Sequence, residues 1–154
     1  MTQTIFRIAF VVIGSFLLAA FCHILGTAPT WECVVTAMAV AAILFAILIF
    51  RIMNFNTIRI LNETYSKAIA ENINIVFTAG IVHAVFAAAA GGLGLWTLQD
   101  SFPTAFGIGA EDVRCVCTFI IGYAAAVFGV NGWNVFRLDR DIDRRIAAET
   151  AGRN

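Results

Sequence analysis

Residues 75–98 read IVFTAGIVHAVFAAAAGGLGLWTL, and no residue in this stretch is charged. A helix rises about 1.5 Å per residue, so a helix of this length can cross the roughly 30 Å hydrocarbon core of a bilayer. The stretch is therefore predicted to be a transmembrane helix, and this prediction decides the class of the fold.

The predicted helix has two unlike faces when its residues are plotted at about 100° per residue. One face carries small side chains: Gly80, Ala84, Ala87, Ala88, Gly91 and Gly92. The other carries large apolar side chains: Val82, Val85, Phe86, Leu93 and Trp96. Because small residues let helix backbones approach closely in lipid, we expect the first face to contact helices and the second to contact lipid.

The composition of the whole chain agrees with a membrane protein. Of 154 residues, 60% are hydrophobic and only 13% are charged, and the mean hydropathy is +0.86. This balance predicts a single membrane domain over residues 1–154. The formal net charge is zero and no basic stripe is present, which argues against a nucleic-acid partner.

Three further apolar segments predict three further spans. Together the predicted spans cover about 5–25, 33–50, 75–98 and 115–136, so the chain is expected to be an all-α bundle of four transmembrane helices. Apolar residues at three-to-four spacing over 51–74 predict an amphipathic helical connector at the membrane surface. The residues after 136 predict a short helical tail, in which Asp141 can pair with Arg145.

The basic residues predict the orientation of the bundle. With four spans, both termini and the connector lie on one side of the membrane. That side holds nine basic residues: Arg7, Arg51, Arg59, Lys67, Arg137, Arg140, Arg144, Arg145 and Arg153. The opposite side holds Arg114 alone. This asymmetry predicts cytoplasmic termini in a bacterial inner membrane, with Arg7 reaching the headgroups from the end of the first span.

His83 is the polar residue nearest the middle of the central span. By helical angle it lies about 60° from the centre of the small-residue face, so we expect it to point into the bundle. A histidine there can relay protons, line an ion path or ligate haem. The alternative is a neutral ring that hydrogen-bonds to a neighbouring helix.

A haem held by both histidines of one chain is not expected. His23 lies about 3 Å inside the outer end of its predicted helix, whereas His83 lies about 20 Å from the outer end of its own. Two axial ligands must be at one depth. A haem is therefore expected only if another subunit shares it, and the sequence predicts no particular cofactor.

The four cysteines, Cys22, Cys33, Cys115 and Cys117, all fall at the outer ends of predicted spans. In an oxidising compartment they could form disulfides and exchange them, and with His23 they could bind Cu(I) or Zn²⁺. However, no C-x-x-C motif is present, and Cys115 and Cys117 are separated by about 200° on a helix. The simpler interpretation is that the cysteines are small apolar packing residues, with no metal bound.

Two pairs of polar residues lie near the inner ends of spans. Asn131 and Asn134 share one face of the last span, and Glu71 and Asn74 share one face of the central span. They predict either a cytoplasmic vestibule or ordinary interfacial polarity.

The sequence predicts a class of function but no specific task. The ladders of small residues favour a helix-packing subunit of a larger membrane complex or homo-oligomer, in contact with lipid and acting in solute transport. The alternatives are a membrane thiol oxidoreductase that uses the outer cysteines and a haem-bearing anchor subunit. No nucleotide-binding or hydrolase motif is present, which favours a role other than an enzyme's.

Overall fold

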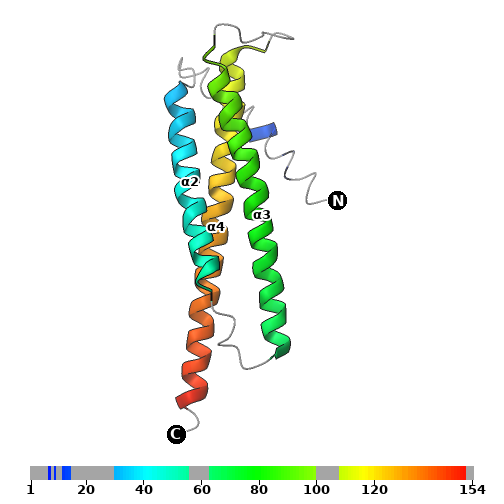
Figure 1. The fold of residues 1–154 in the computed structure, drawn as a ribbon, viewed down its shortest axis with the longest axis vertical. Helices are drawn as coiled ribbons and strands as arrows, with labels where there is room; N and C mark the ends of the chain where they lie inside the picture. Colours follow the sequence, from blue (N-terminus) through cyan, green and yellow to red (C-terminus); the bar gives the residue numbers. More distant parts are fainter. Residues whose placement is uncertain are drawn as a thin grey trace.

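The computed structural model describes residues 7, 9, 12–14, 30–55, 63–99 and 108–151. Its three long helices are α2 (Trp31–Met53), α3 (Glu63–Trp96) and α4 (Ala110–Ala151). They lie side by side, with α3 antiparallel to α2 and α4, and α4 extends beyond the other two (Figure 1). All three are long and apolar enough to cross a membrane, which supports a multi-pass membrane protein.

The predicted first span, 5–25, lies mostly outside the described residues. Arg7, Ala9 and residues 12–14 are helical. A Cβ built on Gly14 would lie 1.9 Å from Cζ of Phe119, so the backbone at Gly14 directly contacts α4. The described part of the chain therefore shows three candidate spans, and the N-terminal segment is placed against them only at these positions.

The helix α2 is longer than the predicted 33–50. It begins at Trp31, with Glu32 in its first turn, where a negative charge is favourable. It ends at Met53, and the Asn54 side chain donates from Nδ2 to the Phe50 carbonyl at 2.7 Å. Both ends are therefore fixed by polar residues outside the apolar run.

The predicted surface connector is not a separate element where the structure describes it. From Glu63 the chain already belongs to α3, which continues through the membrane-spanning part to Trp96. No glycine or proline occurs between Glu63 and Gly80, so nothing interrupts the helix at the water interface.

The helix α4 likewise joins regions that the sequence analysis separated. It begins at Ala110, five residues before the predicted span 115–136. Asp112 Oδ2 accepts a hydrogen bond of 2.9 Å from the Gly109 amide, and Glu111 adds a second acid to the first turn. The predicted tail is the continuation of α4, in which Asp141 lies 3.7 Å from Arg144.

The helices pack along seams with a seven-residue repeat, and α4 is the central helix. One row of buried and half-buried positions follows steps of four and three through α3 to the residue after its end: Ile69, Ile73, Val76, Gly80, His83, Ala87, Ala90, Gly94 and Thr97. Ala79, Ala84 and Gly91 are buried or half-buried beside this row. In α4 the same steps join Cys117, Ile121, Ala124, Phe128, Asn131, Val135, Leu138 and Ile142. In α2 the buried residues Val34, Ala41 and Leu48 are seven apart. This repeat is typical of helices that cross at a shallow, left-handed angle.

The predicted small face of α3 is partly right. Gly80, Ala87 and Gly91 are buried as expected, but Ala88 and Gly92 are exposed. At about 100° per residue Ala88 and Gly92 lie at the edge of that face, and the packed side of α3 is centred instead on the side of His83, Ala87 and Ala90. The predicted outer face is confirmed, because all five of its large side chains are exposed.

Glycine matters most where α3 approaches α2. A Cβ on Gly91 would lie 2.5 Å from Sδ of Met38, and a Cβ on Gly94 would lie 3.0 Å from Cγ1 of Val34. The absence of side chains at these two positions allows the close contact.

Candidate functional site

The candidate site is centred on His83, which is half-buried in the α3 seam. The residue follows Glu71 by twelve positions and precedes Trp96 by thirteen, so it lies about 18 Å and 20 Å along the helix from these ends. His83 is therefore near the middle of the predicted hydrocarbon region.

One ring nitrogen of His83 is already engaged within α3. Nδ1 lies 2.7 Å from the carbonyl oxygen of Ala79. A carbonyl oxygen can only accept, so Nδ1 must carry the hydrogen. Nε2 is then the nitrogen that is left for a further partner, as an acceptor in the neutral ring and as a donor in the cation.

Tyr123 of α4 lies beside His83, with the two ring centroids 5.8 Å apart and the ring planes tilted by 43°. The sequence analysis did not single out Tyr123. A tyrosine in the middle of a predicted span is a signal that could have identified it, because its hydroxyl needs a polar partner in lipid.

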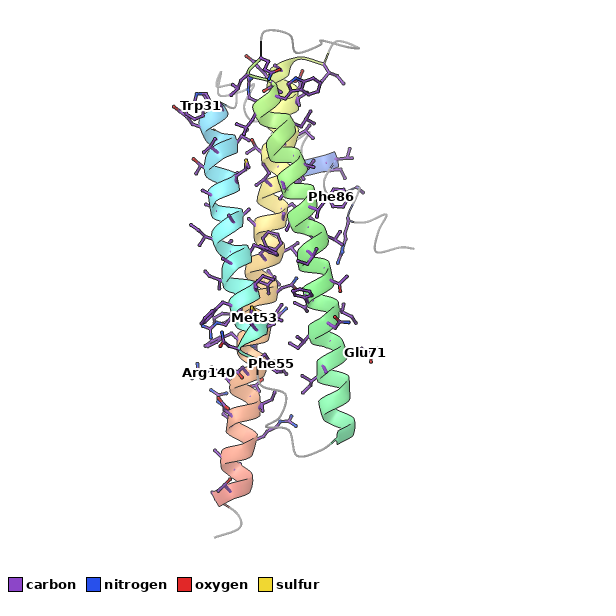
Figure 2. All side chains as sticks on the ribbon, viewed as in Figure 1. Trp31, Met53, Phe55, Glu71, Phe86 and Arg140 are labelled. Carbon is purple, nitrogen blue, oxygen red and sulfur yellow. The ribbon has the colours of Figure 1, made fainter. Side chains whose placement is uncertain are left out.

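Two open cavities of about 310 Å³ and 440 Å³ meet at His83 and Tyr123. Both are lined by residues of α3, α4 and the N-terminal segment. The smaller cavity is lined by Arg7, Val12, His83, Phe86, Ile120, Tyr123 and Ala124. Phe86 points towards the side of α3 on which the N-terminal segment lies (Figure 2). The larger cavity extends from His83 towards the start of α3, where Ile75 and Asn131 line it.

Arg7 lines both cavities, which differs from the predicted position among the headgroups. It shares them with residues from Ile75 to Phe86 of α3, a stretch that includes the middle of that helix. Arg7 therefore borders the same space as His83, on the side of the bundle where Gly14 lies against Phe119 of α4. Sequence spacing alone could not reveal this, because it does not show how one helix is placed against another.

The four residues of the two predicted polar pairs separate into two groups in the structure. Asn131 lines the larger cavity and is half-buried. Asn134, Glu71 and Asn74 are exposed and line neither cavity, and Glu71 projects from α3 away from α2 and α4 (Figure 2). The structure thus brings Asn131, and not the other three, to His83.

The three described cysteines lie at the same end of the bundle. Cys33 is in the first turn of α2 and is exposed, whereas Cys115 and Cys117 are near the start of α4 and are buried. Both cysteines of α4 are buried despite their angular separation, because the central helix is covered on more than one side. All three are free thiols, and no cluster of possible metal ligands occurs among the described residues.

Cys22 and His23 lie outside the described residues. The predicted thiol, metal and shared-haem arrangements that include them therefore stay predictions. The described residues of α2, α3 and α4 place His83 without a second histidine beside it.

A polar contact joins α3 and α4 where α3 ends. Arg114 Nη1 donates to Oγ1 of Thr97 at 3.2 Å, and this hydroxyl donates to the Gly94 carbonyl at 2.6 Å. Thr97 is buried, and α3 has no basic residue in its last turn. Arg114 therefore supplies a positive charge at the carboxyl end of α3, where the helix dipole favours a cation.

A second contact between α2 and α4 lies at the opposite end of the bundle, where α2 ends. The guanidinium groups of Arg51 and Arg140 lie 4.9 Å and 5.6 Å from the ring centroid of Phe136. Trp133 packs on the same ring, with centroids 5.5 Å apart. Cations and aromatic rings together are typical of a membrane–water interface.

No protein-family model matches the chain, and neither the curated proteins nor the solved structures contain a match.

Proposed function

We propose that this protein is a helix-packing subunit of a larger membrane assembly, that the assembly transports a solute, and that the protein lies in a bacterial inner membrane with cytoplasmic termini. The observation that carries the proposal is a set of glycines on α3 and α4 that face open space. In the described part of the chain, no atom lies within 4 Å of a Cβ built on Gly92, Gly122 or Gly132. Such positions leave space in which the backbone of another helix can approach.

The charge distribution supports the same proposal. Within α3 no acidic residue follows Glu71. A carrier that couples transport to ions by itself usually has an acid near the membrane midplane, so a subunit is favoured over an autonomous carrier. The transport part rests on the larger cavity, which extends from Asn131 to His83 and is lined by several polar side chains.

The orientation is supported by the ends of the helices. Arg51 lies in the last turn of α2, and both Arg51 and Arg140 contact Phe136, with Arg140 near the end of α2 (Figure 2). Arg114 lies near the start of α4, at the opposite end of the bundle. This distribution favours a cytoplasmic location for the first end.

The assembly is tested by chemical crosslinking in native membranes, followed by mass measurement in mild detergent. We expect a species heavier than the single 16.7 kDa chain. Gly92→Leu and Gly122→Leu should reduce this species while leaving the thermal unfolding of the chain unchanged, because neither side chain meets an atom of the described chain. Val85→Phe, which adds as many carbon atoms as Gly→Leu at an exposed position of α3, is the matched control and should assemble normally. A wild-type protein that is found only as a single chain contradicts the proposal.

A further inference from the structure

We propose that the two cavities at His83 form one binding site for a hydrophobic monoanion, that is, a carboxylate on a single apolar chain, with Arg7 as its charge partner. The proposal goes beyond assembly, because the site lies between α3, α4 and the N-terminal segment, and none of the exposed glycines named above lines it.

The lining of the site indicates the chemistry of the ligand. Among the described lining residues, the polar side chains are Arg7, His83, Tyr123 and Asn131. The other described lining residues are apolar, from Val12 and Phe86 to Val127 and Val130. A few polar groups in a mainly apolar cavity are typical of sites that hold a small molecule with one polar end.

Electrostatics selects an anion. None of the described residues that line the two cavities is acidic, so the guanidinium of Arg7 has no carboxylate partner there. A cation that deep in a membrane is costly unless it is paired or reaches water. A carboxylate can accept two hydrogen bonds from a guanidinium in parallel, which makes this pairing strong and directional.

The volumes and the depth select a single-chain molecule. The cavities share Arg7, His83 and Tyr123, and each falls in or near the range of roughly 300–1,000 Å³ that small-molecule sites occupy. His83 lies about 18 Å from the level of Glu71, measured along α3. A phospholipid headgroup stays at the interface, whereas a slender carboxylate can enter from the inner side beside Asn131.

The experiment uses the full-length protein in nanodiscs of uncharged lipid. The probes are a palmitate analogue with a photoreactive diazirine in its chain, the corresponding alcohol and a photoreactive phosphatidylglycerol. We expect palmitate to label residues of the cavity walls that do not face bulk lipid, such as Ala124 and Val127, as mapped by mass spectrometry. Unlabelled palmitate should compete, and the alcohol should label the walls much less.

Two variants of different kinds test the role of the charge and of the space. Arg7→Gln should lower labelling by at least about tenfold, the loss expected when a charged hydrogen bond is removed, and Arg7→Lys should retain most of it. Val127→Trp, which fills the larger cavity and keeps Arg7, should also block labelling. Arg51→Gln is the matched control, because Arg51 is an exposed arginine that lines neither cavity, and its labelling should equal that of the wild type.

Three results would overturn the proposal. They are equal labelling by the acid and the alcohol, unchanged labelling in a folded Arg7→Gln variant, and labelling of the cavity walls by the phospholipid alone. The fold of each variant is checked by its helical circular dichroism, so that loss of labelling is counted only for a folded protein.

Discussion

At the scale of single residues, the polar contacts of this bundle occur where lipid offers no partner. Thr97 is buried at the end of α3, and its hydroxyl both donates to Gly94 and accepts from Arg114. The contact satisfies one polar group of each helix and places a cation at a helix carboxyl end. The contact between α3 and α4 therefore depends on the Thr97 hydroxyl, which a hydropathy plot does not distinguish from the apolar residues around it.

We predict that Thr97→Val lowers the free energy of unfolding by about 1 kcal/mol, because Arg114 loses a hydrogen-bond acceptor in a buried place. The measurement is the unfolding of the detergent-solubilised protein in increasing dodecyl sulfate. Thr78→Val, at an exposed position of the same helix, is the control and should leave the midpoint unchanged. Equal midpoints for the wild type and Thr97→Val would show that the link contributes nothing to stability.

At the scale of the helices, the seam of α3 explains both the success and the error of the sequence analysis. The outer face was predicted correctly because large side chains at five positions are exposed. The packed face is instead centred on the side of His83, so Ala90 and Gly94 belong to it and Ala88 and Gly92 do not. Size alone does not decide which alanine or glycine lies in a contact.

Leucine substitutions at neighbouring alanines distinguish the two faces. We predict that Ala90→Leu destabilises the protein by about 1–3 kcal/mol, because the larger side chain overfills a packed seam. Ala88→Leu should change stability by no more than about 0.5 kcal/mol, because Ala88 is exposed in the single chain. The same unfolding assay measures both. A larger loss of stability in Ala88→Leu than in Ala90→Leu would instead support the small-residue face predicted from the sequence.

At the scale of the whole molecule, the two ends of the bundle have the chemistry of the two surfaces of a membrane. Trp31 and Arg51 are twenty residues apart on α2, which corresponds to about 30 Å, the thickness of a hydrocarbon core. The exposed Cys33 lies at the same end of the bundle as Trp31. At the opposite end, which holds Arg51, the charged part of α4 extends beyond α2 (Figure 1).

This arrangement predicts the side from which each end is accessible. In a variant that keeps Cys33 as its sole cysteine, a membrane-impermeant maleimide added to intact spheroplasts should label the protein. In a cysteine-free variant carrying Thr150→Cys, labelling should require permeabilised membranes, because the end of α4 is expected to be cytoplasmic. Labelling of position 150 but not of Cys33 in intact spheroplasts would reverse the proposed orientation.

The sequence by itself determined the solvent of this protein, its all-helical class and the existence of the spans, because lipid leaves a long uncharged run such as residues 75–98 no alternative to a helix. It also singled out His83 and Asn131, which both line the larger cavity. Only the tertiary structure decided that Tyr123 lies beside His83, that Arg7 lines the same cavities while Asn134 and Glu71 do not, and that α3 and α4 continue beyond the membrane-spanning parts. The physical reason is that hydrophobicity and helical period are properties of one segment, whereas a site depends on how several helices are rotated and shifted against one another.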